Sequence, residues 1–515
     1  MPGLFTNSKT PKIGQNRKAG TTKSSPMIFA PLILFAIVFA GCQGSSPENI
    51  SAFAEFPKPK AWKAKTIEQP QYQPDRFWIS DFGDKNLDAF VQQALKCNRE
   101  IKAALARIEV AANTARITGA DIHPKISGGL GGQRAKQNFI GFPFGGAGGG
   151  GGVLSSHSSQ WNLSLDTSWE IDLWGRVKAA QSAAIAEMEA SQYDRAVLDL
   201  SIAGQAVKAW FLLAESRDQV KLAEGTLVIF RKTEDSIRDR FERGIEEGNS
   251  GSFGSQLLLA ETDVATAEDA LASRKELVSR TARTLEVLAG KYPAGEAGKS
   301  AKLPPFPDKR PVSLPCSVLE RRPDLIAAER RLAATDKRLV QAKRAMLPSL
   351  GLTNSVGTTT ERFGHLLNDQ FTVWSVAGNL TQPILQGGML RNTIQRNHAE
   401  MAVAKAEFEQ TVLTAFSDVE NALSAEKFFA DRIVALTKAA KLSKESYHRS
   451  GEEYINGTGD LLTMLTAQQR MFTQQSQLIS LRRQQLEARV DLHLALAGSF
   501  ECPVSIHTAA SPLSP

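Results

Sequence analysis

The residue types that most often carry out catalysis are present in this chain but are not grouped. The seven histidines are scattered, and neither His-Glu-x-x-His nor Gly-x-Ser-x-Gly occurs. The glycine run around Gly148 lacks the Lys-Ser or Lys-Thr that ends a phosphate-binding loop. Cys97, Cys316 and Cys502 have no metal-ligand spacing and no disulfide framework, and their pairing state stays open. We therefore expect no catalytic residue, no metal site and no cofactor, and an enzyme is the least favoured class.

One further cysteine has surroundings that indicate covalent lipid attachment. The apolar run at 27–40 follows a basic segment, and its roughly 14 residues are too few to span a bilayer of ~30 Å. It ends in Phe39-Ala40-Gly41-Cys42, which resembles the lipobox of bacterial lipoproteins, in which the cysteine becomes the lipidated first residue. Gln43, in place of Asp, is typical of lipoproteins sent to the outer membrane. We expect a signal peptide at 1–41 and a lipid-anchored segment at 42–80, with ordinary small-residue cleavage as the alternative.

Length and charge narrow the class of protein further. At 515 residues the chain is too long for one compact core. Its net charge of +7 comes from 61 basic and 54 acidic residues, and five of the basic residues precede the expected cleavage site. Removing them leaves 56 against 54, so the mature chain gives no electrostatic reason to expect nucleic-acid binding.

The stretch from Trp161 to Gly175 alternates with a period of two. Its odd positions up to Leu173 are mainly apolar, whereas its even positions up to Asp172 are polar and include Asp166, Glu170 and Asp172. This pattern predicts a strand with one dry face and one acidic face. The strand is longer than is usual in a soluble sheet and suits the roughly 10-residue tilted span of an outer-membrane barrel. The three acidic residues are then candidates for the lumen-facing side, and a half-exposed strand of a soluble sheet is the alternative.

The chain contains an internal repeat. A shift of 224 residues aligns the segment from Ala94 with the segment from Val318, and a shift of 213 aligns Trp161 and Gly175 with Trp374 and Gly388. The first loop is longer and contains a glycine-rich run. The repeats are expected at 81–297 and 298–500, followed by a tail at 501–515, and the predicted strands lie near 125–134, 161–173, 349–357 and 374–385.

Each repeat continues as a long helix that turns and returns. The intervals 175–244 and 388–457 contain no proline or turn cluster, which predicts helices of roughly 100 Å, or several shorter helices as the alternative. Gly244 and Gly457 mark the tip turns. Apolar residues then recur every seven positions and predict a coiled-coil seam. A shift of 208 relates the two returning helices, whose seam positions are Leu257, Val264, Leu271, Val278 and Leu285 in the first and Leu465, Phe472, Ile479, Leu486 and His493 in the second. We interpret His493 as a seam or rim residue rather than a ligand.

Four predicted membrane strands are too few to close a barrel. The smallest outer-membrane barrels have about eight strands, and open strand edges are not tolerated in lipid. The chain is therefore expected to pool strands with copies of itself. Two copies would give eight strands with a filled lumen, whereas three would give twelve strands with room for a pore.

The sequence resembles the TolC-like outer-membrane efflux proteins, and in particular the lipoprotein outer-membrane factors of resistance-nodulation-division pumps (NodT type). The resemblance implies a mainly α protein with a membrane β-barrel portion, in which a homotrimer forms a 12-stranded β-barrel and a periplasmic α-helical barrel. It also implies an adaptor protein and an inner-membrane pump as partners, the outer membrane of a Gram-negative bacterium as location, and no catalysis. The matching pieces are Phe82-Gly83-Asp84 with Leu87, Ala94-Leu95 with Asn98, Trp169 to Arg176, Arg322-Pro323-Asp324-Leu325, Ala345 to Leu350, and Asp418 to Leu423.

The resemblance further implies a constriction of aspartates near the second tip turn. Asp460 is the nearest candidate, although the turn is shorter than in relatives, and an ordinary solvated turn aspartate is the alternative. Three carboxylates on one axis would repel one another and attract cations.

Two other functions remain open. A periplasmic coiled-coil adaptor lipoprotein has one helical hairpin, whereas this chain is predicted to have two. An outer-membrane channel of a type I protein secretion system would share the architecture, and the lipobox favours efflux of drugs, toxic compounds or metals. The sequence does not identify the exported compound.

Overall fold

The fold is described from a computed structural model of the chain. It describes residues 62–63, 71–72, 78–139, 154–243, 253–308, 310–311, 318 and 320–496. Several of the predicted features lie outside these residues, namely the signal peptide at 1–41, Cys42, most of 42–80, the glycine run, Gly244, Cys316, Cys502 and the tail at 501–515.

The internal repeat is visible in the matched lengths of the elements. The helices that precede the strands, α3 and α7, have 22 residues each, and the long helices, α4 and α8, have 67 residues each. The prediction of two uninterrupted long helices is confirmed, and the alternative of several shorter helices is wrong. The elements of the first repeat are α3 (Arg99–Ala120), β2 (Lys125–Phe139), β3 (Leu154–Ile171), α4 (Arg176–Glu242) and α5 (Phe253–Leu288). Those of the second are α7 (Pro323–Arg344), β5 (Ser349–Thr360), β6 (Thr372–Thr381), α8 (Met389–Ile455) and α9 (Leu461–Ala495).

Shorter elements lie outside the matched helices and strands of the two repeats. A 3₁₀ turn, η3 (Trp78–Phe82), and helix α2 (Lys85–Cys97) come before α3. Asn98 separates α2 from α3 because its side chain accepts hydrogen bonds from the backbone N–H groups of Glu100 and Ile101 and so caps α3. Between α5 and α7, β4 (Arg310–Pro311) pairs in parallel with β1 (Gln71–Tyr72). The β5–β6 connection contains the turns η4 (Phe363–His365) and η5 (Asp369–Phe371).

The four long strands form one antiparallel sheet in the order β2-β3-β5-β6. Their bounds differ from the predicted ones at several ends. β2 continues to Phe139 and β3 begins at Leu154, whereas β3 stops at Ile171 and β6 stops at Thr381. β6 ends there because Gln382 is followed by Pro383, which has no N–H to donate to a strand ladder.

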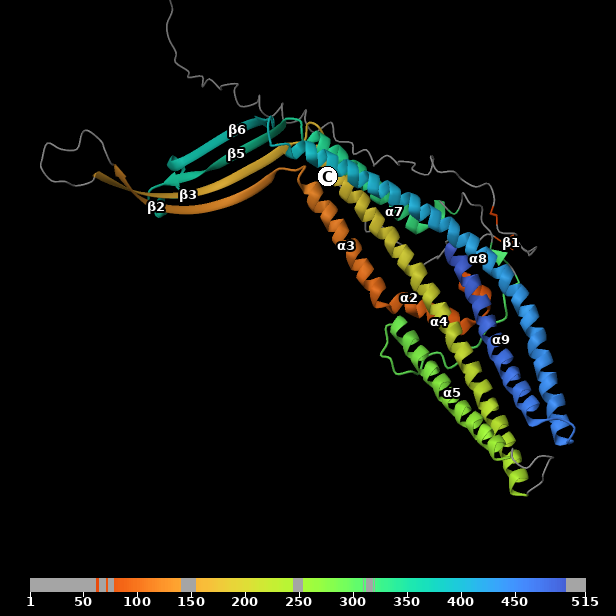
Figure 1. Cartoon of the computed structure of the whole chain (residues 1–515). Helices are drawn as coiled ribbons and strands as arrows, with labels where there is room; N and C mark the ends of the chain where they lie inside the picture. Colours follow the sequence, from red (N-terminus) through yellow and green to blue (C-terminus); the bar gives the residue numbers. More distant parts are fainter. Residues whose placement is uncertain are drawn as a thin grey trace, which may run out of the picture. The chain divides into compact units, whose positions relative to one another are not determined.

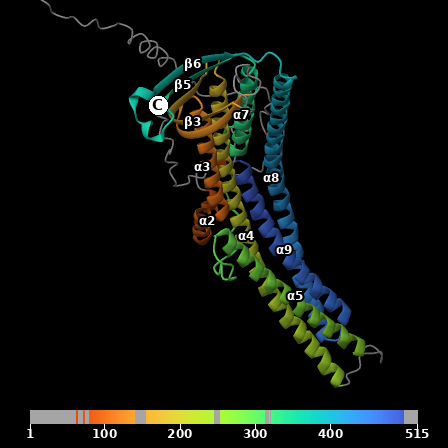
Figure 2. The ribbon, with the colours of Figure 1, turned by 90° about the vertical axis from the view of Figure 1, so that its left-hand side faces the viewer.

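The long helices pack side by side as two hairpins (Figures 1 and 2). In the half nearer the tips the order of contact is α5-α4-α9-α8, and nearer the sheet it is α3-α4-α7-α8. Leu285 and Leu486, which are seam residues of α5 and α9, are both buried in the main apolar cluster. The heptad pattern therefore marks the packed faces of the returning helices.

Buried polar side chains join the two repeats between α4 and α9. Glu215 on α4 accepts hydrogen bonds from Ser480 and Arg483 on α9. Gln219 donates to the carbonyl oxygen of Ser476 at 2.9 Å and accepts from its hydroxyl at 2.8 Å. Buried charges need such partners, because an isolated one would cost several kcal/mol of desolvation. The network therefore fixes how the two hairpins align along their length.

His493, at the end of α9, is fully buried, so the rim alternative is wrong. Its ring stacks on Trp78 with 5.2 Å between ring centroids, and Asp81 Oδ2 lies 3.8 Å from Nε2, beyond hydrogen-bonding distance. Complete burial, and then the nearby charge of Arg489, lowers the pKa of His493 to about 3. Arg489 itself pairs with Glu426 on α8. Since burial outweighs the attraction of Asp81, the folded protein holds His493 neutral.

Acid should therefore weaken the fold through His493. The unfolded chain binds a proton below a pKa of about 6.5, so the free energy of unfolding should fall between about pH 6.5 and 3 by up to about 1.4 kcal/mol per pH unit. In His493→Leu, which introduces the residue type found at the matching Leu285, this part of the dependence should disappear. Thermal unfolding of the detergent-solubilised protein at pH 7.5 and pH 5 measures the difference. Equal losses in both proteins would contradict the assignment.

Candidate functional site

The sheet has one polar and one apolar face. Residues directly opposite each other in an antiparallel ladder share a face, so the strand register places Asp166 on the same face as Ser127 and Ser355. Ser355 and Ser164 donate hydrogen bonds to the two oxygens of Asp166, at 2.6 Å and 2.8 Å. Asp166 is thus held on the polar face, at the even positions of β3.

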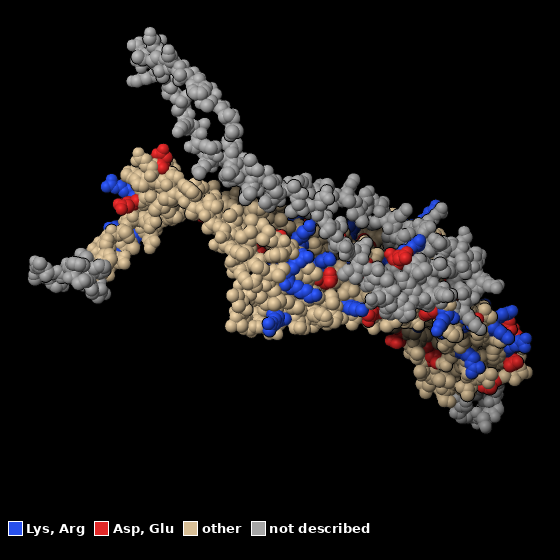
Figure 3. Space-filling view, turned by 90° about the horizontal axis from the view of Figure 1, so that it is seen from above, with Lys and Arg blue, Asp and Glu red and all other residues tan. Residues whose placement is uncertain are grey.

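The opposite face of the sheet carries exposed apolar side chains. On the side visible in Figure 3, the strand region shows charged side chains mainly at its end far from the helices. Such a face is unfavourable in water and suits hydrocarbon. Its exposed members, assigned by register, are Ile126, Leu130, Leu163, Leu165, Val356, Trp374, Val376 and Leu380.

The other two acidic candidates lie where β3 meets α4. Glu170 is near the strand end and pairs with Arg176, whose Nη2 lies 2.8 Å from each carboxylate oxygen. Asp172 lies beyond the end of β3, and its Oδ2 accepts a hydrogen bond from the backbone N–H of Lys178 in the first turn of α4. The prediction that the strand includes Asp172 is wrong, because this carboxylate serves the start of the helix.

The same junction is fixed by a glycine in the left-handed region. Gly175 has a φ of 74° and lies immediately before α4, and its carbonyl oxygen accepts a hydrogen bond from Arg344 of α7 at 2.8 Å. A Cβ at this position would lie 2.7 Å from the Arg344 guanidinium. Trp174 donates to the carbonyl oxygen of Pro348 at 2.7 Å and so connects the two repeats. The sharp change from strand to helix therefore needs glycine here.

At the other end of the hairpins, Asp460 is the N-cap of α9. Its carboxylate accepts hydrogen bonds from the Thr463 backbone N–H at 2.9 Å and from the Thr463 hydroxyl at 2.6 Å. The Thr463 hydroxyl and then its N–H lower the pKa of Asp460, so the exposed carboxylate is ionised at neutral pH. Gly457, with a φ of 74°, forms the preceding turn. Asp460 thus has a structural role as the cap of α9.

The two tips contact each other. Arg240 in the last turn of α4 lies over the ring of Tyr454 in α8, 4.5 Å from its centroid. Beneath it, Tyr454 is buried in an apolar cluster with Ile237 of α4 and Leu461 of α9. Next to the tip turns the two hairpins are therefore joined by a small apolar cluster rather than by a large core.

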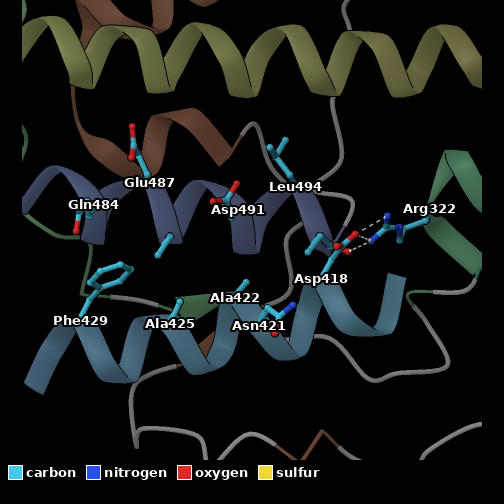
Figure 4. A pocket seen from close by; sticks show the side chains of 12 residues that line it. Arg322, Asp418, Asn421, Ala422, Ala425, Phe429, Gln484, Glu487, Asp491 and Leu494 are labelled. Carbon is cyan, nitrogen blue, oxygen red and sulfur yellow. Dashed lines mark hydrogen bonds and ion pairs between the residues drawn. The ribbon is translucent and has the colours of Figure 1, made fainter. Parts of the chain in front are cut away.

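A groove of about 570 Å³ lies between α8 and α9, nearer the sheet (Figure 4). At one end Arg322 bridges Asp324 of α7, at 2.7 Å, and Asp418 of α8, at 3.2 Å. Along its length Glu487 and Asp491 line the α9 side. Arg322, Asp324 and Asp418 belong to the matched sequence pieces, but no local pattern indicated that they would meet. Within the described part of the chain, no group of three or more His, Cys, Asp or Glu residues is arranged to hold a metal.

One described helix, α4, contains a stretch long and apolar enough to cross a membrane by composition. About 44% of that stretch is buried inside the protein. Since α4 packs against α3, α5, α7 and α9, we interpret it as a core helix.

Comparison with known proteins gives one family. The sequence model of the outer membrane efflux protein family matches residues 90–291 and 314–498. The pyoverdine export outer membrane protein OpmQ of Pseudomonas putida is 28% identical over 454 residues, which cover 86% of this chain and 92% of that protein. The probable efflux pump outer membrane protein TtgC of Pseudomonas putida is 26% identical over 482 residues, covering 91% and 95%.

The fold agrees with solved structures of the same kind. The outer-membrane channel OprN superimposes with a TM-score of 0.74 at 23% identity, over 88% of this chain and 97% of that chain. The relatives are efflux proteins rather than enzymes. The chain is mainly helical, has a four-stranded sheet with one polar and one apolar face, and matches the family over both repeats. It therefore belongs to the outer membrane efflux protein family and is a TolC-like outer-membrane channel component of an efflux pump in a Gram-negative bacterium.

Proposed function

We propose that three copies of the chain assemble into a passive conduit, with a 12-stranded β-barrel in the outer membrane and a helical barrel in the periplasm. The observation that carries this proposal is the sheet β2-β3-β5-β6, whose outer strands each have one unpaired edge among the described residues. Unpaired backbone groups are not tolerated in hydrocarbon, so β2 of one copy would pair with β6 of another. Repetition of that contact gives a closed ring.

Three copies fit the polar face better than two. An eight-stranded barrel has an interior filled by side chains, whereas twelve strands leave room for water. Asp166 and its serine partners would then line the pore. Glu170 and Asp172 would lie at the pore's periplasmic entrance, where each also holds the junction of β3 with α4. This arrangement gives a polar, cation-tolerant passage.

The partners follow from the class of pump. A periplasmic adaptor would contact the helical barrel and link it to an inner-membrane pump, which supplies the energy. The conduit itself would use no cofactor and perform no catalysis. Relatives are named for export of pyoverdine and for efflux, and we propose small molecules as the cargo here. We further propose that Cys42 is lipidated and anchors the N-terminal segment to the outer membrane.

The two faces of β6 provide a test of the barrel. Val376→Arg places a charge on the apolar face and should cost about 2–4 kcal/mol per copy near the bilayer centre, greatly lowering the amount of trimer in outer membranes. Ala377→Arg, the neighbouring change on the polar face, should leave trimer formation nearly unchanged. The measurement is the heat-sensitive trimer band on unboiled gels of detergent extracts. A monomeric wild-type protein, or equal loss in both variants, would contradict the proposal.

Asp460 is proposed as the periplasmic constriction, and its capping role requires a matched set of variants. Asp460→Asn keeps an N-cap side chain but removes the charge, whereas Asp460→Ala removes both. If three carboxylates restrict the closed tip, both variants should raise the single-channel conductance of the trimer and reduce its preference for cations. Planar bilayer recordings measure this. A conductance that changes in Asp460→Ala but not in Asp460→Asn would assign Asp460 to capping alone.

Lipid attachment is tested separately. Cys42→Ser should abolish incorporation of labelled palmitate and leave the uncleaved or unlipidated chain as the product. Labelling that persists in Cys42→Ser would contradict attachment at this residue.

A further inference from the structure

The two outer helices of the tip half each have an uncovered side. α4 packs between α5 and α9, whereas the extensive helix contacts of α5, within the described elements, are with α4 alone. On the other side, α8 packs on α9 (Figure 2). If copies form a ring, as proposed above, α5 of one copy comes next to α8 of another.

The internal repeat supplies a template for this contact. A shift of 213 residues relates α4 to α8, and a shift of 208 relates α5 to α9. The contact between α4 and α9 within one copy therefore has a counterpart between α8 of one copy and α5 of the next. Each α4–α9 pair of residues can be converted into an expected pair across the ring.

The first converted pair carries opposite charges. The shifts take Gln219 to Arg432 and Ser476 to Glu268. Arg432 is exposed, and its guanidinium lies 5.4 Å from the ring centroid of Phe429. The Glu268 side chain is 51% exposed and pairs with Arg231 of α4 at 2.6 Å. A carboxylate accepts several hydrogen bonds, so it can receive a second guanidinium.

The second converted pair is complementary in size. The shifts take Glu215 to Phe428, which is 61% exposed, and Ser480 to Ala272, which is also exposed. The buried carboxylate of the contact within the copy is thus replaced by a large apolar ring facing a small residue. Arg483 becomes Lys275, which pairs with Glu224 of its own hairpin at 3.4 Å. Lys275 therefore keeps a carboxylate partner, although the position that matches Glu215 is occupied by Phe428.

We infer that α8 of one copy packs against α5 of the next through an Arg432–Glu268 ion pair and a Phe428–Ala272 contact. The inference rests on the proposed ring of copies. The contact within a copy contains a buried hydrogen-bonded network, whereas the contact between copies consists of an exposed ion pair and an apolar contact. Since exposed ion pairs contribute little and are weakened by salt, the tip half separates more readily between copies than within them.

Disulfide cross-linking tests the predicted neighbours in outer membranes containing the full-length chain. Ala272→Cys with Phe428→Cys, in a background with Ser at Cys97, Cys316 and Cys502, should give covalent dimers and trimers on oxidation. Each single variant should give none. Ala272→Cys with Lys441→Cys is the matched control, because Lys441 lies on a different side of α8, and it should also give none.

The outcomes separate the inference from the proposed function. A trimer on unboiled gels without Ala272–Phe428 cross-links would overturn the inference and leave the trimer intact. A chain that stays monomeric would overturn both. Cross-links of equal yield with Lys441→Cys would overturn the specific pairing.

The ion pair has its own test within the cross-linking background. Arg432→Glu should lower the yield of Ala272–Phe428 cross-links several-fold, because it places two carboxylates together. Salt at 1 M shortens the screening length to about 3 Å and should restore much of that yield. Arg432→Lys should retain cross-linking, and Lys441→Glu, on the other side of α8, should not change it. An Arg432→Glu yield equal to the parent at low salt would overturn the ion pair.

Discussion

Backbone hydrogen bonding at the edges of the sheet is the constraint on which the rest of this structure depends. Within the described residues the sheet ends at β2 and β6, and the residues on one of its faces are apolar enough for hydrocarbon. A strand edge in lipid has no water with which to form hydrogen bonds. In the proposed ring the edges are completed by other copies of the chain, and the pore is formed by that completion rather than by any reactive side chain.

Among the described residues the helices, like the strands, pack against one another and leave the outer sides of the outermost elements uncovered. The two repeats are held together at the sheet junction by Trp174 and Arg344, which bond to backbone carbonyl oxygens of the other repeat. Farther along, Glu215 and its α9 partners fix the alignment of the hairpins. Near the tips they are joined by a small apolar cluster around Tyr454 and by side-chain contacts such as that of Gln469 with Asp263. The apolar packing between the repeats is thus less extensive near the tips than in the main cluster.

Most of the architecture could be predicted from the sequence because it depends on local periodicity. Alternation with a period of two gave the strands, and the absence of breakers over 69 residues gave the two long helices. Because of the internal repeat, each strand and each long helix was predicted from two separate segments. Agreement between the two segments supports the prediction more strongly than either segment alone. Strand ends were less accurate, since β2 and β3 extend through polar residues whose pairing with each other is not visible in either segment.

For the candidate site residues too, some features follow from spacing along the chain and others only from tertiary packing. The sequence by itself determined the element types, the repeat, and the polar face that carries Asp166, because these follow from spacing along the chain. Only the tertiary structure decided that Asp172 supports the start of α4, that His493 stacks on Trp78, and that Arg322 meets Asp418. These contacts join residues whose partners are set by the packing of separate helices and turns, and no pattern within one segment records which distant side chain will fill the adjoining space.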